Sequence, residues 1–201
     1  IVVVPLAIDE SFRDLEVIKE KQHYFIFIGG RNPYKNYDRL ILAFGEFVKL
    51  FPDWKLHVVG GNTPAIQARE TARYRELGIT SHVVDHGYLS QGDLVALVQK
   101  AGALITPSLN EGFNIPLLEG MAAGTPVLSS DIPASRELGN GYVRFFSPIS
   151  IEEMIQAMKK VVMHPPSHVE LVAAQRRART YTWKNSFREL MEVYTSIHQG
   201  N

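Results

Sequence analysis

The chain has 201 residues, and its apolar fraction of 45% is ordinary for a globular protein and too high for a disordered one. Its 21 basic residues balance 21 acidic ones, so the overall charge gives no sign of a nucleic-acid surface or a polybasic membrane anchor. The sequence has no cysteine, which excludes disulfides and thiolate metal sites, and no apolar run approaches the roughly 20 residues that span a bilayer.

The first 20 residues read as an interdomain linker that leads into a folded domain. The chain opens without Met and without the charged segment of a signal peptide, so we expect a part of a longer protein. Apolar runs then alternate with amphipathic stretches. The runs predict strands at 24–28, 55–59, 82–85, 103–106, 126–129 and 142–146. The stretches between them predict helices at 36–50, 64–77, 91–100, 116–123 and 134–138.

This alternation implies right-handed crossovers and a parallel sheet covered on both faces. We therefore predict an α/β fold, a Rossmann-like doubly wound parallel sheet, over residues 21–150. From residue 150 onward the pattern is helical only, with helices expected at 151–163, 167–180 and 183–198. Residues 151–201 are expected to form a C-terminal helical extension that packs on the sheet domain. For the aromatic residues Trp183 and Tyr194 on the last helix, we favour packing in the core.

The first strand is followed by Gly29, Gly30 and a segment with two cations, Arg31 and Lys35. Glycine allows close approach to a ligand. We expect Asn36 to cap the helix that follows, whose N-terminus carries partial positive charge. Arg31 could make bidentate hydrogen bonds to a diphosphate, and Lys35 could contact it as a point charge. The alternative is a surface turn with two solvated cations.

The fourth predicted strand leads into a loop with Glu111 and a helix with Glu119, and Pro116 lies between the two carboxylates. Proline suits a first helical turn, so Glu111 should lie in the loop and Glu119 within the helix. Ligands bind at this carboxyl edge of a parallel sheet, and the two carboxylates could hold sugar or ribose hydroxyls. A general acid and base of a glycoside hydrolase is the alternative chemistry, although the nearby cations make it less natural.

Other motifs are weaker. Tyr88 follows the third predicted strand and either lines the pocket or packs in a turn. The dinucleotide fingerprint, the phosphate-binding P-loop and the usual metal-ligand spacings are all missing from the sequence.

Taken together, these motifs resemble the C-terminal, donor-binding domain of the GT-B glycosyltransferases of family 4. Residues 4–12 look like the interdomain linker, and residues 30–36 are similar to the Gly-Arg…Lys-Asn segment of a subgroup rich in mannosyl- and O-antigen-type transferases. Glu111 through Glu119 matches the E-x7-E motif. Residues 124–130 look like the segment after it, and residues 183–194 are similar to a terminal helix that crosses back toward the N-terminal domain.

The resemblance implies roles for residues. Arg31 and Lys35 would hold the donor diphosphate, Glu111 the sugar hydroxyls and Glu119 the ribose. The resemblance places further donor-binding residues around them: Gly30, Tyr88, Gly112, Phe113, Asn114 and Ile115. Asn114 departs from the commoner glycine, and we expect the loop to tolerate it because Asn accepts left-handed backbone angles.

The implied parent protein is a retaining enzyme that moves a hexose, with mannose as the candidate, from a GDP-, UDP- or ADP-linked donor to a glycan or lipid-linked acceptor. The resemblance implies no cofactor and no metal, a cytoplasmic location with peripheral membrane contact through the missing N-terminal domain, and no nucleic-acid partner. We expect the 201 residues to bind nucleotide and transfer nothing alone. A non-catalytic nucleotide-sugar-binding module and a nucleotide-sugar epimerase of the same fold are the alternative functions.

Overall fold

The structure of the protein, a computed structural model, describes residues 2–199. Its centre is one six-stranded sheet in which every neighbouring pair of strands is parallel, in the order β3-β2-β1-β4-β5-β6. The strands are β1 (Gln22–Ile28), β2 (Lys55–Val59), β3 (Val83–Gly87), β4 (Ala101–Thr106), β5 (Val127–Ser130) and β6 (Arg144–Phe146). The predicted doubly wound α/β fold is confirmed.

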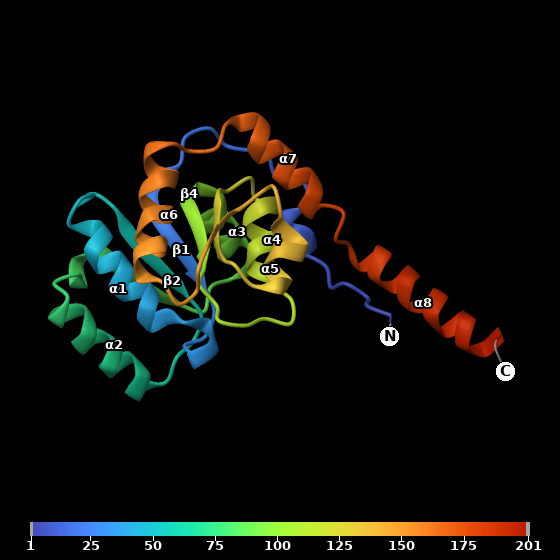
Figure 1. The fold of residues 1–201 in the computed structure, drawn as a ribbon, viewed down its shortest axis with the longest axis horizontal. Helices are drawn as coiled ribbons and strands as arrows, with labels where there is room; N and C mark the ends of the chain where they lie inside the picture. The colour runs from blue at the N-terminus through green and yellow to red at the C-terminus, as the bar shows by residue number, and fades with distance from the viewer. Residues whose placement is uncertain (1, 200–201) are drawn as a thin grey trace.

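Helices cover both faces of the sheet (Figure 1). They are α1 (Tyr37–Val48), α2 (Pro64–Glu76), α3 (Gln91–Lys100), α4 (Ile115–Ala122), α5 (Pro133–Gly139), α6 (Ile151–Met163), α7 (His168–Ala178) and α8 (Trp183–Gln199). One apolar core lies between the sheet and helices α1, α2 and α6, and a second lies between the sheet and helices α3, α4 and α7. The central strands β1 and β4 are therefore buried from both sides, which explains their nearly continuous apolar sequences.

The strand order reverses between β1 and β4. The chain winds outward from β1 through β2 to β3, then crosses to β4 and winds outward the other way. In such sheets the loops after the two central strands separate at their carboxyl ends and leave a crevice, which is the usual ligand site. The two motif-bearing segments follow β1 and β4, so the topology brings them to the same crevice.

Part of the N-terminal segment packs against the domain, although Val2 and Val3 are exposed. Ala7, Ile8 and Phe12 are buried, and the latter two belong to the core beneath α3 and α4. The Ile8 backbone N–H donates a hydrogen bond to the carbonyl of Tyr181, just before α8. The segment that contains the short 3-10 helix Glu10–Phe12 is thus attached to the domain.

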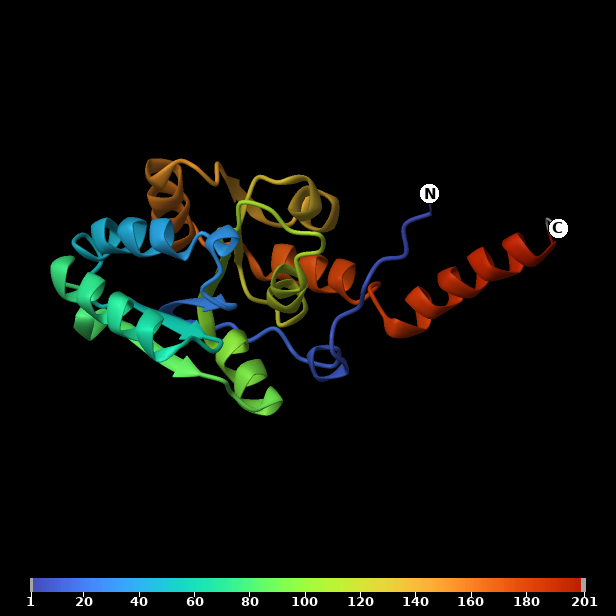
Figure 2. The same cartoon turned by 90° about the horizontal axis from the view of Figure 1, so that it is seen from below.

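Helix α8 projects away from the rest of the molecule (Figures 1 and 2). The expectation that Trp183 and Tyr194 pack in the core is wrong, because these side chains are 56% and 60% exposed. The same face of α8 also exposes Phe187, Leu190, Met191 and Ile197. An amphipathic pattern predicts that a helix face is apolar, but it does not say whether the surface that covers the face belongs to the same chain.

Candidate functional site

Two loops meet at the crevice between β1 and β4. The backbone N–H of Leu109, in the loop after β4, donates to the carbonyl of Tyr34, in the loop after β1, at 2.7 Å. The Asn36 side-chain amide donates to the carbonyls of Pro107 at 2.9 Å and Pro148 at 2.7 Å. Hydrogen bonds therefore join the loops after β1, β4 and β6 at this edge of the sheet.

Asn36 has a left-handed backbone with φ of 58° and immediately precedes α1. Its side chain makes no capping bond to that helix and is buried in the contacts with the two proline carbonyls instead. Asparagine tolerates this backbone region better than most residues. The expectation that the Asn36 side chain caps this helix is wrong, because the side chain joins the loops instead.

Lys35 and Glu111 form an ion pair across the crevice. Lys35 Nζ lies 2.7 Å from Glu111 Oε1, and the side chains are 15% and 9% exposed. Ser108 Oγ donates to the same carboxylate oxygen at 2.7 Å. The structure thus brings together one predicted cation and one predicted carboxylate, and it adds Ser108, which the sequence analysis did not single out.

Glu119, the second predicted carboxylate, lies in α4, the helix that follows the loop with Glu111. Glu111 lies in the loop and Glu119 lies inside α4, as the position of Pro116 predicted. Burial, and to a smaller degree the negative charge of Asp9, raises the pKa of Glu119 to about 7. Between residues 2 and 199 no side chain or backbone group hydrogen-bonds to the Glu119 carboxyl. A half-buried acceptor of this kind is available to ligand hydroxyls.

Asn114 closes the loop onto the sheet. Its side-chain oxygen accepts from the N–H of Leu117 and so caps α4, while its amide donates to the hydroxyls of Thr106 and Ser135, each at 3.1 Å. Its φ is −90°, so the expectation that Asn serves here by tolerating a left-handed backbone is wrong. The physical reason for asparagine is the buried hydrogen bonding of its side chain.

The loop between Glu111 and α4 holds the other predicted donor-binding residues. Gly112 is exposed, and Phe113 and Ile115 are half-buried. Within the described part of the chain, the backbone N–H groups of Gly112 and Phe113 make no hydrogen bond, so they remain available to a ligand. They lie just before the N-terminus of α4, where the helix dipole favours an anion.

Tyr88 lies at the carboxyl end of β3 and is 88% exposed. A Cβ on Gly61 would come within 2.3 Å of its ring, so the ring packs against the glycine backbone after β2. Gly30 lies in the neighbouring turn after β1. A Cβ on Gly60 would come within 2.6 Å of the Gly29 carbonyl oxygen, which shows how closely these turns approach each other.

Arg31 occupies a different environment from Lys35. Its side chain is 1% exposed and forms ion pairs with Glu70 at 3.0 Å and Asp85 at 2.9 Å. Neither acid was singled out from the sequence, because they lie 39 and 54 positions further along the chain. The predicted contact of Arg31 with a diphosphate stays a prediction, and the guanidinium is already engaged before any ligand binds.

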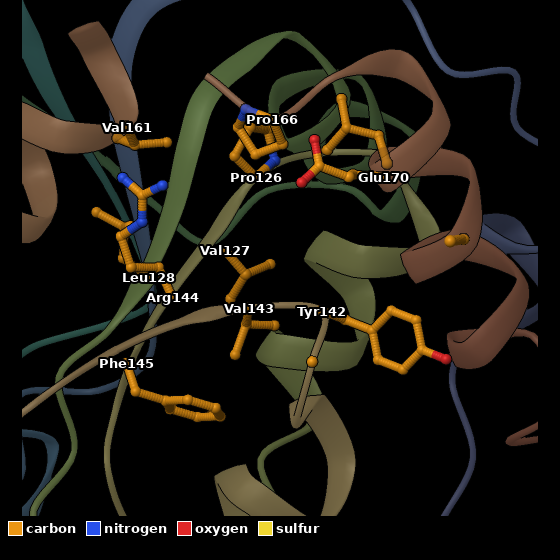
Figure 3. A pocket seen from close by; sticks show the side chains of 13 residues that line it. Pro126, Val127, Leu128, Tyr142, Val143, Arg144, Phe145, Val161, Pro166 and Glu170 are labelled. Atoms are coloured by element: carbon orange, nitrogen blue, oxygen red, sulfur yellow. The ribbon is translucent and has the colours of Figure 1, made fainter. Parts of the chain in front are cut away.

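A cavity of about 440 Å³ lies at the opposite edge of the sheet, where β5 and β6 begin (Figure 3). Apolar side chains such as Val127, Val143 and Val161 line it, and Arg144 and Glu170 lie on either side of Pro126 and Pro166. None of the predicted site residues lines this cavity.

Neither a metal-binding cluster nor a membrane-spanning helix is present in the described part of the chain. Across residues 2–199, no three histidine or acidic side chains cluster in a way that could hold a metal ion. No helix in the same range combines the length and the apolarity needed to cross a membrane.

Comparison with known proteins identifies relatives. Residues 9–178 match the family model described as "Glycosyl transferases group 1". Over 148 residues the chain is 32% identical to the O-antigen chain mannosyltransferase RfbU of Salmonella typhimurium. The aligned region covers 73% of this chain and 40% of that protein. Over 206 residues it is 26% identical to the serotype-specific mannosyltransferase WbdA of Escherichia coli, covering 97% and 25% respectively. The chain therefore spans less than half the length of these curated relatives.

Solved structures share the fold. A glycosyltransferase from Rickettsia africae superposes with a TM-score of 0.85 at 18% identity, over 100% of this chain and 58% of that one. HepE from Anabaena, solved in complex with UDP, superposes with a TM-score of 0.74 at 17% identity, over 89% and 49%.

Proposed function

Because the chain belongs to the group 1 glycosyl transferases, we propose that it is the donor-binding half of a retaining glycosyltransferase that uses a nucleotide diphosphate sugar. The observation that carries the proposal is the ion pair of Lys35 and Glu111 at the reversal point of the sheet, beside the backbone N–H groups of Gly112 and Phe113, which have no hydrogen-bond partner within residues 2–199. A cation and backbone donors suit a diphosphate, and the neighbouring carboxylates suit hydroxyls.

In this proposal each group has one task. Lys35 neutralises the charge that develops on the leaving diphosphate, and the N–H groups before α4 bind its oxygens. Glu111 accepts hydrogen bonds from sugar hydroxyls, and Glu119 accepts them from the ribose. Tyr88 and Gly30 border the crevice on the side of β1 to β3, where the nucleotide would lie.

The acceptor would bind elsewhere. The relatives are much longer than this chain, and we propose that a further, N-terminal domain of the whole protein supplies the acceptor site. On this view the 201 residues bind nucleotide without transferring sugar, and the whole enzyme works in the cytoplasm, in peripheral contact with the membrane. Both relatives named above are mannosyltransferases, which favours mannose as the hexose and a glycan or lipid-linked acceptor.

Calorimetric titration of the chain with GDP, UDP and ADP and with their sugars tests the donor site. Lys35→Ala should weaken binding of the preferred nucleoside diphosphate by about tenfold or more, because a charge-assisted contact is lost. Lys49→Ala is the matched control, since Lys49 pairs with Glu46 in an exposed position. Equal affinities of the Lys35 variant and the unchanged chain would contradict the proposed phosphate contact.

The role of metal ions has its own test. We propose that protein groups alone neutralise the diphosphate, so removing divalent cations with a chelator should leave the affinity for the nucleoside diphosphate unchanged. A large loss of affinity in the chelator, restored by Mg²⁺ or Mn²⁺, would show that a cation belongs to the donor complex.

A further inference from the structure

Arg31 lies in an enclosure that uses nearly all its hydrogen-bonding capacity. Its Nε donates to Glu70 and its Nη2 to Asp85, while its Nη1 donates to the carbonyls of Gly29 at 3.1 Å and Gly60 at 3.3 Å. These four bonds use four of the five N–H donors of a guanidinium. The plane also lies over the ring of Tyr37, 4.8 Å from its centroid.

The charge around Arg31 is unfavourable for a phosphate. One guanidinium faces two carboxylates, so the cluster carries a formal charge of −1 before any anion arrives. Withdrawing Arg31 toward a diphosphate would leave Glu70, whose side chain is 3% exposed, without its ion-pair partner. Breaking a buried pair in this way is costly, because an uncompensated charge remains buried.

The contacts of Arg31 join four segments of the chain. Gly29 follows β1, Gly60 follows β2, Asp85 lies in β3 and Glu70 lies in α2. Only two side chains of α2 are buried: Tyr74, which belongs to the apolar core, and Glu70, which pairs with Arg31. Arg31 therefore holds one of the two buried side chains of this helix.

The same enclosure determines the path of the turn that carries Lys35. The Lys35 stem lies against Gly29, with its Cε 3.5 Å from the place that a Gly29 Cβ would occupy. Because Arg31 holds the Gly29 carbonyl, it fixes the surface along which the Lys35 side chain runs toward Glu111.

We propose that Arg31 is a positioning residue that anchors the Gly29–Lys35 turn to Glu70 and Asp85, and that Lys35 is the cation of this turn that contacts the donor diphosphate. The proposal rests on the donor-binding function given above. It departs from the expectation that both cations bind the diphosphate directly.

The sign of the effect of Glu70→Gln separates the two roles. If Arg31 positions the turn, removing the Glu70 charge loosens the anchor and weakens nucleoside diphosphate binding by about threefold or more. If Arg31 contacts the phosphate, the same change frees a guanidinium for the ligand, and the affinity stays equal or rises. Glu76→Gln is the matched control, because Glu76 forms an exposed ion pair with Arg73 on the same helix.

A double-mutant cycle adds a readout that a general loss of stability would not mimic. Because Arg31 is proposed to act through Lys35, Arg31→Gln should weaken binding in the unchanged chain but not further in Lys35→Ala. Two independent phosphate ligands would give additive losses. Arg31→Lys keeps the charge but not the planar set of guanidinium donors, so it should weaken binding as much as Arg31→Gln does. Restoration of affinity by this lysine would overturn the proposal. Thermal melts establish that each variant is folded at the titration temperature.

Hydrogen exchange of the free chain completes the test without nucleotide. Glu70→Gln should speed amide exchange in residues 29–36 relative to Glu76→Gln, and equal exchange would overturn the anchor. If the unchanged chain binds no nucleoside diphosphate, the proposed function fails, whereas the exchange result still decides whether Arg31 anchors the turn. Additive losses in the cycle, or tighter binding by Glu70→Gln, would overturn the positioning role alone.

Discussion

Lys35 Nζ lies 2.7 Å from Glu111 Oε1, across the point where the strand order of the sheet reverses. The two residues are 76 positions apart, one after β1 and the other after β4. Their pairing holds a cation and a sugar-binding candidate in one place before a donor arrives. A diphosphate that binds Lys35 must therefore compete with the Glu111 carboxylate for it.

This competition predicts opposite effects of Glu111→Gln on two ligands. The free nucleoside diphosphate should bind about fivefold more tightly, because Lys35 no longer has a carboxylate partner. The nucleotide sugar should lose the extra affinity that its hydroxyls provide, because the amide is a weaker acceptor than the carboxylate. Titration with both ligands measures the difference, and Glu46→Gln at the exposed Lys49 pair serves as the control. A parallel change for both ligands would contradict the assigned hydroxyl contact.

Glu119 should make the stability of the chain depend on pH. Its pKa is raised from 4.5 to about 7 in the folded state. Below pH about 4.5 the carboxyl is protonated in both states. Between about 4.5 and 7 the unfolded state loses its proton first, and above about 7 the folded state holds a buried carboxylate. The contribution of Glu119 to stability therefore falls as the pH rises through this window, by on the order of 3 kcal/mol.

Urea unfolding of the unchanged chain and Glu119→Gln checks this prediction. The variant should gain stability relative to the unchanged chain between pH 5 and pH 8, because glutamine does not ionise. A difference between the two proteins that is the same at both pH values would show that Glu119 titrates near its ordinary pKa.

Asn114 should be the more costly of two helix caps to remove. Asn114→Ala loses the cap of α4 and leaves the buried hydroxyls of Thr106 and Ser135 without their amide donor, which should cost about 2–4 kcal/mol. Thr63→Ala removes only the exposed cap of α2 and should cost about 1 kcal/mol. Urea titrations of the two variants give the free energies of unfolding to be compared. Equal costs would mean that the hydroxyl contacts of Asn114 contribute little.

Helix α8 should be dispensable for the stability of the sheet domain. Its apolar face is exposed, so ending the chain after Thr182 removes little buried surface. Thermal unfolding of the shortened chain should give a midpoint within a few degrees of that of the full chain. A loss of about 1 kcal/mol produces a shift of this size in a domain of this length. A much larger drop would show that α8 folds back onto the domain in solution.

The sequence determined the fold class and the place of the site because both depend on local patterns. Alternating apolar runs and amphipathic stretches predict β1 through β6 with connecting helices, and Pro116 correctly placed Glu111 in a loop and Glu119 in a helix. Errors were mostly at element ends. The predicted strand at 82–85 begins one residue later, because His82 ends a 3-10 turn.

The tertiary structure alone decided which partner each charged or polar side chain has. Arg31 and Lys35 are four positions apart, yet one is buried against Glu70 and Asp85 and the other reaches Glu111. Hydrogen bonds and ion pairs join residues far apart in the chain and depend on distances of a few ångströms, which periodicity and spacing do not encode. The sequence therefore determined which chemical groups gather at the carboxyl edge of the sheet, and the packed fold determined which of them are free to meet a ligand.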